Sequence, residues 1–220
     1  MDLTNKTVCF LGDSITKGHS ASAPEKCYVS LFAAAHPEAT VHNFGISGTC
    51  IAKRIGPSVK VKMDAQNFLT RVEKMPEHAD LICVFGGSND FGRGDAPMGK
   101  FGDTENDTFY GALYALSLAL INKYPTAHIV FFTPLHRDYK GESSVTVRAD
   151  GEWTLEDYVD AVRQNAAYFA FPVLDLHVMS GFQPHVPIIK ELYTADGLHP
   201  NDRGYERLFR IVNKFIENLE

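Results

Sequence analysis

The sequence predicts an α/β fold, a three-layer α/β/α sandwich around a roughly five-stranded parallel sheet. Short apolar runs rich in β-forming residues alternate along the chain with longer segments whose apolar residues recur at helical spacing. Strands separated by helices pair in parallel through right-handed crossovers, and helices then cover both faces of the sheet. No repeat, low-complexity tract or linker interrupts this alternation, so we expect a single domain over residues 1–220.

The predicted strands are short apolar runs. The first begins at Thr7 and stops abruptly at Gly12, and the third likewise ends at glycines, Gly86 and Gly87. In chain order, strands are expected at residues 7–12, 41–44, 80–85, 128–133 and 172–176. We expect a flavodoxin-like strand order, in which chemistry collects beyond the carboxyl ends of the strands.

Helices are predicted between these strands at residues 27–36, 64–74, 108–124 and 154–170, with a last helix from residue 203 onward. Prolines end the first two, and Thr154 followed by Asp157 is typical of a helix start. In the last helix the apolar residues recur at helical spacing, so one face should pack on the sheet. Two polar segments, residues 91–107 and 134–153, are too long for simple connections and are predicted as loops.

Composition narrows the functional classes. A net charge of −6 argues against a general nucleic-acid surface, and no apolar run is long enough to span a membrane. The N-terminus lacks a signal-peptide pattern, so we expect a cytoplasmic protein, with a removed signal as the alternative. The four cysteines show no zinc-like spacing and are expected to be free thiols; neither a metal nor an organic cofactor is expected.

Small polar clusters follow three strands, and a fourth cluster precedes the last helix. They read Gly12-Asp13-Ser14, Gly45-Ile46-Ser47-Gly48, Gly86-Gly87-Ser88-Asn89-Asp90 and Asp196-Gly197-Leu198-His199-Pro200. Acyl transfer needs a nucleophile, a base, a group that orients the base, and donors for the oxyanion. Ser14 and His199 can supply the first two, and Asp196 can orient the imidazole. Gly48 and Asn89 offer a backbone and a side-chain N–H donor.

Each of these residues also has a structural alternative. His199 could belong to the loop before the last helix, Asp196 could form an Asx turn, and Gly48 could permit a positive φ. Asn89 could cap a helix. Ser47 and Ser88 are alternative nucleophiles, but neither lies in a Gly-x-Ser-x-Gly motif.

Other polar residues near these clusters are expected to support the site. Asp13 and Asn43 are expected to bond backbone groups that shape it. His136, Arg137 and Tyr139 follow the fourth strand, so they either line the pocket or are ordinary loop residues.

Taken together, the four clusters resemble the conserved blocks of the SGNH hydrolases, the GDSL-like lipases and acylhydrolases. The blocks occur in the family's order between residues 12 and 200, although Ile15 stands where many members have leucine. The resemblance implies a Ser-His-Asp esterase of Ser14, His199 and Asp196. It also implies an oxyanion hole made by the Ser14 N–H, the Gly48 N–H and the Asn89 Nδ2.

The substrate is expected to be a small-molecule ester with a short acyl group, above all acetyl, on a carbohydrate or similar polar alcohol. This follows from the polar content of the two long loops, with Phe91, Phe101, Tyr139 and Trp153 as candidate aromatic surfaces for a sugar ring. One alternative is a lysophospholipase or thioesterase that acts on longer chains. The other is a non-catalytic module that binds a phosphate or nucleotide at the strand ends, although no P-loop motif is present.

Overall fold

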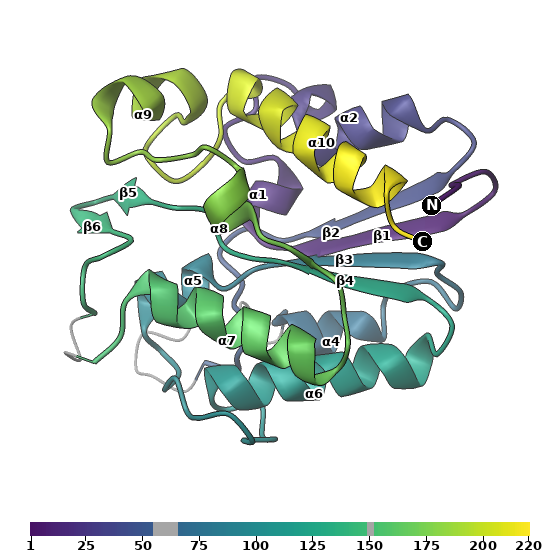
Figure 1. Cartoon of the computed structure of the whole chain (residues 1–220), viewed down its shortest axis with the longest axis horizontal. Helices are drawn as coiled ribbons and strands as arrows, with labels where there is room; N and C mark the ends of the chain where they lie inside the picture. Colours follow the sequence, from purple (N-terminus) through teal and green to yellow (C-terminus); the bar gives the residue numbers. More distant parts are fainter. Residues whose placement is uncertain (55–65, 149–151) are drawn as a thin grey trace.

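A computed structural model of the chain describes residues 1–54, 66–148 and 152–220. Its central sheet has five parallel strands in the order β2-β1-β3-β4-β7 (Figure 1). The strands are β1 (Thr7–Gly12), β2 (Thr40–Gly45), β3 (Leu81–Phe85), β4 (His128–Phe132) and β7 (Val173–Leu174). The predicted α/β sandwich and its flavodoxin-like order are therefore confirmed.

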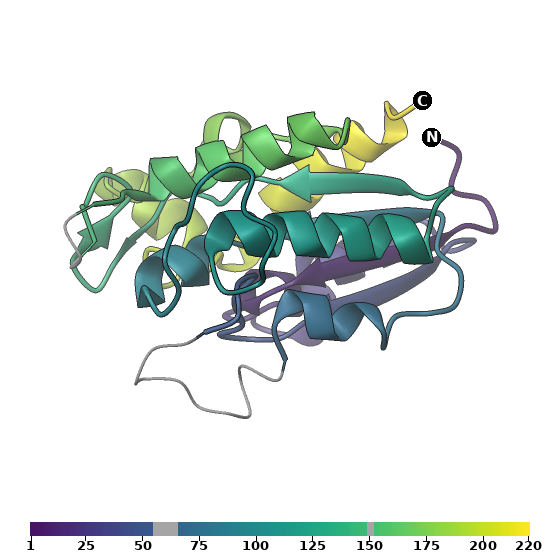
Figure 2. The same ribbon diagram turned by 90° about the horizontal axis from the view of Figure 1, so that it is seen from below.

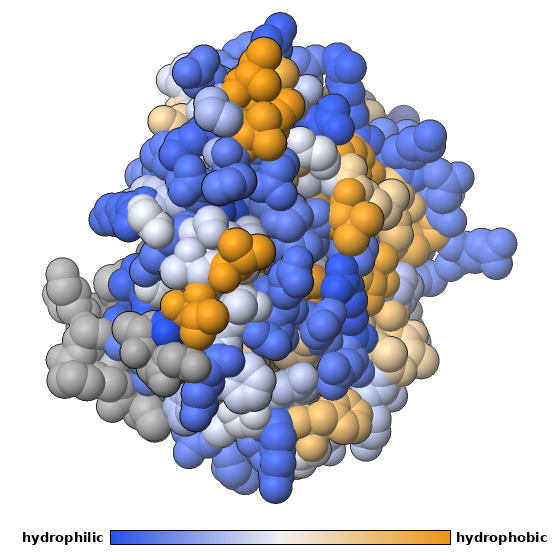
Figure 3. Space-filling view, turned by 60° about the vertical axis from the view of Figure 1, so that its left-hand side comes forward, coloured by the Kyte–Doolittle hydropathy of each residue, from blue (hydrophilic) through white to orange (hydrophobic). Residues whose placement is uncertain are grey.

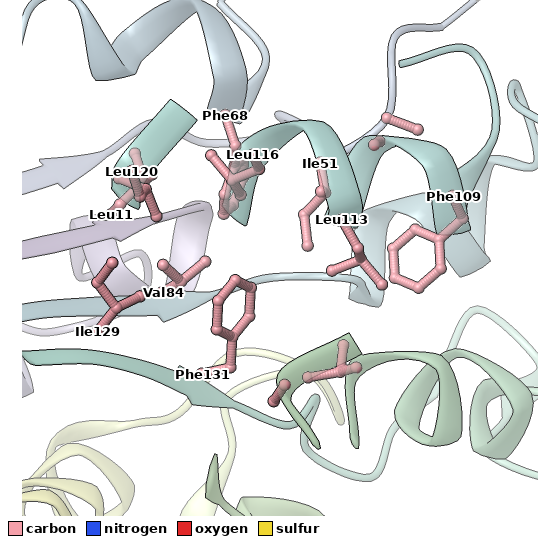
Figure 4. Close-up of a cluster of buried hydrophobic side chains, with 14 of the residues drawn as sticks. Leu11, Ile51, Phe68, Val84, Phe109, Leu113, Leu116, Leu120, Ile129 and Phe131 are labelled. Carbon is pink, nitrogen blue, oxygen red and sulfur yellow. The ribbon is translucent and has the colours of Figure 1, made fainter. Parts of the chain in front are cut away.

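Helices cover both faces of this sheet (Figure 1), and the view from below shows the helices of one face in front of the strands (Figure 2). The helices that flank the sheet are α2 (Tyr28–Ala35), α4 (Phe68–Val72), α6 (Phe109–Lys123), α7 (Leu155–Tyr168) and α10 (Asp202–Glu217). Side chains alternate along β1, so Cys9 and Leu11 pack against α4, α6 and α7, whereas Val8 and Phe10 pack against α2 and α10. Figure 4 shows the first of these two cores.

The helix start predicted at Thr154 is confirmed, because Thr154 and Asp157 form a capping box at the start of α7. Helix α10 begins one residue before the predicted residue 203, and Asn201, which was not predicted as its cap, accepts from the Gly204 N–H. The helix predicted at residues 64–74 is shorter than expected: Asn67 caps it, and α4 ends at Val72. Residues 64 and 65 lie outside the described residues.

The two segments predicted as loops contain short regular elements, which their polar sequences did not indicate. Helix α5 (Ser88–Arg93) occupies the start of the first loop. The second holds a hairpin of β5 (Asp138–Tyr139) and β6 (Glu142–Ser143), joined by Lys140 and Gly141 at positive φ. The prediction that residues 91–107 and 134–153 are loops was therefore wrong in part. Helices and strands were predicted from hydrophobic periodicity, and short polar elements lack such periodicity.

Several further short elements were not predicted. They are α1 (Ser14–Lys17), the 3₁₀ helix η1 (Pro24–Lys26), α8 (Leu176–Met179) and α9 (Pro187–Tyr193). The last strand is also shorter than expected, because the Asp175 side chain already caps α8. The helices α1, α5 and α9 and the β5–β6 hairpin gather at one end of the sheet, away from the two chain termini (Figure 1). Within the described part of the chain, no helix is long and apolar enough to cross a membrane.

Candidate active site

Ser14 lies where β1 turns into α1. The Asp13 side chain accepts a hydrogen bond from the Ile15 N–H at 2.9 Å, which caps the short helix and holds the serine at its first position. Asn43 shapes the same turn, because its amide donates to the Thr16 carbonyl and its oxygen accepts from the Gly45 N–H. The expected supporting roles of Asp13 and Asn43 are confirmed.

Ser14, His199 and Asp196 form a continuous chain of hydrogen bonds. The Ser14 Oγ lies 3.0 Å from the His199 Nε2, and the His199 Nδ1 lies 2.7 Å from the Asp196 Oδ2. The second Asp196 oxygen accepts from the backbone N–H groups of Leu198 and His199. The turn requires Gly197, whose φ is +88° and where a Cβ would lie 2.0 Å from the Asp138 carbonyl oxygen. The loop therefore holds the carboxylate and the imidazole at one geometry.

The environment sets the protonation states of this pair. Burial acts to raise the pKa of Asp196, but the hydrogen bonds from His199 and Leu198 outweigh it and hold the pKa below its usual value. Burial lowers the pKa of His199, which the bond to Asp196 only partly offsets. An ionised Asp196 can only accept, so the His199 Nδ1 carries the proton and Nε2 is free to accept from the Ser14 hydroxyl.

The other two expected oxyanion donors, Gly48 and Asn89, lie in the same cleft as Ser14. Gly48 and Asn89 line it together with Ser14 and His199, in a hollow of about 450 Å³. The Asn89 Nδ2 donates to the Thr49 carbonyl at 3.0 Å and lies 3.4 Å from the Asp13 Oδ2, so its amide is oriented by the protein. Gly48 has a φ of +76°, so the alternative reason for a glycine here, a backbone with positive φ, also holds.

The alternative nucleophiles lack comparable partners. Ser88 is buried, and its hydroxyl has no hydrogen-bond partner among the described residues. Ser47 lines the cleft but makes no hydrogen bond to a histidine in the part of the chain that the structure describes. Of the three candidate nucleophiles, Ser14 is therefore the one that is hydrogen-bonded to a histidine in the described part of the chain.

Arg71 is a supporting residue that sequence reasoning missed. Its buried guanidinium donates to the carbonyls of Gly12 and Phe44 and to the Thr49 hydroxyl, which joins the ends of β1 and β2 to the loop after Gly48. No local pattern marks it, because all three acceptors are distant in sequence. Asp90 anchors the same loop by accepting from the Ile51 and Ala52 N–H groups at 3.0 and 2.9 Å.

His19 was also missed, although it follows Ser14 by a single helical turn and a glycine. Its ring packs edge-on against the His199 ring at 4.4 Å between centroids. The Tyr139 ring also lies edge-on to His199, at 6.0 Å between centroids. The imidazole therefore packs against two rings in addition to its hydrogen bonds.

Of the segment after β4, Arg137 and Tyr139 line the cleft, whereas His136 bonds Ser144 and stacks on His177 outside it. Tyr139 is the one expected aromatic surface that lines the cleft. Phe91 and Trp153 pack with the core, and Phe101 borders a separate hollow beside α6 and α7. The prediction was wrong for these three because a loop's composition does not say which of its side chains face inward.

Polar side chains dominate the cleft. The residues that line it are Ser14, His19, Ser47, Gly48, Asn89, Gly92, Arg93, Arg137, Tyr139, Lys140, Glu142, Leu198 and His199. The view that brings this end of the molecule forward is mainly hydrophilic, with scattered hydrophobic residues (Figure 3). Within the described ranges, no group of three or more His, Cys, Asp or Glu side chains is arranged to hold a metal, and all four cysteines are buried free thiols.

A sequence model of the GDSL-like lipase/acylhydrolase family matches residues 10–207, which contain all four polar clusters. The chain belongs to this family. Members act as hydrolases on esters, and the resemblance of the four blocks to the SGNH hydrolases is thereby confirmed. No protein of curated function shows significant sequence similarity to the chain.

Solved structures resemble this GDSL-like chain over its whole length. A protein from Lactobacillus plantarum is 32% identical, with a TM-score of 0.84 and 100% of both chains covered. A possible lipase from Chitinophaga pinensis is 21% identical, with a TM-score of 0.73 over 96% of this chain and 98% of that one. The lipase/acylhydrolase from Enterococcus faecalis is 22% identical, with a TM-score of 0.63 over 96% and 95%. The last two likenesses show a shared fold.

Proposed function

We propose that this protein is a serine esterase that removes short acyl groups, acetyl above all, from a carbohydrate or other polar alcohol. The observation that carries the proposal is the hydrogen-bonded series Ser14–His199–Asp196, with distances of 3.0 and 2.7 Å between the successive partners. A binding module has no need of a serine aligned on a neutral imidazole that is in turn oriented by a carboxylate.

In the proposed reaction, the Ser14 Oγ attacks the ester carbonyl carbon while the His199 Nε2 takes the hydroxyl proton. Asp196 keeps the ring oriented and stabilises the imidazolium. The Ser14 and Gly48 N–H groups and the Asn89 amide stabilise the tetrahedral oxyanion. The C–O bond then breaks, and the alcohol leaves with the proton from His199. Water activated by His199 hydrolyses the acyl-enzyme and restores Ser14.

The cleft lining supports a polar substrate with a short acyl group. A long acyl chain needs a continuous apolar wall, because each buried methylene contributes about 0.8 kcal/mol. Among the residues that line the cleft, Leu198 and Tyr139 alone have largely apolar side chains. Hydrogen-bonding and charged groups occupy the remaining wall, as a hydroxyl-rich alcohol requires.

Two measurements test the proposal. A fluorophosphonate should label the wild-type protein at Ser14, identified by peptide mass, and should not label Ser14→Ala; unlabelled wild-type protein would favour the non-catalytic binding module. Turnover of 4-nitrophenyl esters from acetyl to octanoyl should be highest for acetyl. A steady rise toward octanoyl would overturn the deacetylase proposal and favour a lysophospholipase or thioesterase.

A further inference from the structure

The active-site cleft concentrates positive charge, although the protein is acidic overall. Three cationic side chains line it, those of Arg93, Arg137 and Lys140, against one carboxylate, that of Glu142. The whole chain has a net charge of −6. A cleft whose charge is opposite to that of its protein attracts ligands of the opposite sign and focuses their approach.

Arg137 and Glu142 neutralise each other. Arg137 is buried, and its guanidinium donates to the Ser88 carbonyl at 3.0 Å and to the Glu142 carboxylate at 2.8 Å. This pair fastens the β5–β6 hairpin to α5, and it leaves Arg93 and Lys140 as the uncompensated charges of the wall.

Arg93 and Lys140 are exposed, and neither side chain has a hydrogen bond or an ion pair with another described residue. The Lys140 Nζ lies 5.0 Å from the centroid of the Tyr139 ring. Both cations therefore keep their donors available for a ligand in the cleft.

Both cations line the same cleft as the residues of the proposed reaction. Lys140 follows Tyr139, whose ring packs against His199, and His199 is the residue that donates its proton to the alcohol oxygen in that reaction. Arg93 follows Asn89 by four residues in α5, one helical turn, and both side chains line the cleft.

We propose that the alcohol released by this enzyme carries an anionic group, a carboxylate or a phosphate, and that Arg93 and Lys140 bind it. This inference rests on the proposed esterase function and specifies its substrate class. The two residues determine specificity, and neither takes part in breaking the ester bond.

Matched acetyl esters test this. The charged substrates are 4-acetoxybenzoate and 4-acetoxyphenyl phosphate, and the neutral one is methyl 4-acetoxybenzoate. Arg93→Gln and Lys140→Gln should each lower kcat/KM for one or both charged esters by about fivefold to tenfold, mainly through KM, as expected for a partly exposed charged hydrogen bond. Turnover of the neutral ester should change less than about twofold. For each ester, the ratio of the variant's kcat/KM to that of the wild type does not depend on the intrinsic reactivity of the ester. The charged ester whose kcat/KM falls more shows whether the bound group is a carboxylate or a phosphate.

Lys74→Gln provides the control, because it removes the same charge from an exposed site that precedes β3, at the opposite end of the strands. It should leave all three rates unchanged. Added salt should reduce the wild-type rate for the charged esters alone.

An equal effect of Arg93→Gln and Lys140→Gln on charged and neutral esters would overturn the inference and leave the esterase proposal intact. So would a charge preference confined to the acyl side, measured with 4-nitrophenyl hydrogen succinate against 4-nitrophenyl butyrate. Failure to hydrolyse every ester, together with an unlabelled Ser14, would instead refute the esterase function and this inference with it.

Discussion

The Arg71 Nη1 donates a hydrogen bond of 2.7 Å to the Gly12 carbonyl, across 59 residues of sequence. The same guanidinium also bonds the Phe44 carbonyl and the Thr49 hydroxyl. Gly12 ends the strand that leads to Ser14, and Thr49 follows Gly48 and accepts the Asn89 amide through its carbonyl. One buried side chain therefore joins the segments that carry Ser14, Gly48 and Thr49, and the Thr49 carbonyl holds the Asn89 amide.

Replacing Arg71 should damage both stability and the site. Arg71→Met leaves two backbone carbonyls and a hydroxyl without their charged donor in the interior, so we expect a loss of about 3–5 kcal/mol in the free energy of unfolding. Thermal denaturation should show a fall in Tm on the order of 10 °C. Thr49→Val, which removes one of the three bonds, should cost about 1 kcal/mol. Arg71→Met with wild-type stability would contradict this account.

Removal of any member of the proposed triad should eliminate most turnover. Ser14→Ala and His199→Ala should each lower kcat by a factor on the order of 10⁴ to 10⁶, and the double variant should be little worse, because the two residues act as a unit. Asp196→Asn should lose less. Stopped assays on purified protein of unchanged Tm measure this. Ser47→Ala is the control, and near-normal activity of Ser14→Ala would show that the nucleophile is another residue.

The Asn89 amide should contribute to turnover more than to binding. It is expected to bond the oxyanion more strongly than the ground-state carbonyl, so Asn89→Ala should reduce kcat by about 10² to 10³ with a smaller change in KM. Steady-state kinetics on an acetyl ester distinguish the two parameters. A raised KM at constant kcat would assign Asn89 to substrate positioning instead.

Activity should be lost on the acid side through protonation of His199. Burial, with the charges of His19 and Arg137, lowers the pKa of His199 below its usual 6.5, and the reaction requires the neutral ring. The kcat/KM for a neutral ester should therefore be constant near pH 7 and fall about tenfold per pH unit only below that lowered pKa.

His19→Gln provides the matched comparison for this pH profile. It removes the neighbouring side chain that lowers the pKa of His199 by its charge, so the descending limb should move to higher pH, toward the usual value for histidine. A wild-type limb centred above pH 6.5, or one that His19→Gln moves to lower pH, would contradict the electrostatic argument.

The sequence by itself determined the layers, the parallel sheet and the identity of the clustered polar residues. Strand and helix periodicity are local properties, and parallel strands bring their carboxyl ends to one edge, so Ser14, Asn89 and His199 could be expected to meet. The tertiary structure alone decided how they are held. Arg71 can bond the Gly12 and Phe44 carbonyls only when β1 and β2 pair. Arg137 can bond Glu142 only when a polar loop folds into a hairpin. The Arg71 bonds join segments that are distant in sequence, and the Arg137–Glu142 bond closes a short polar hairpin, so neither leaves a period in the sequence. For the same reason, loop composition could not show that Tyr139 would face the cleft while Phe91 would be buried.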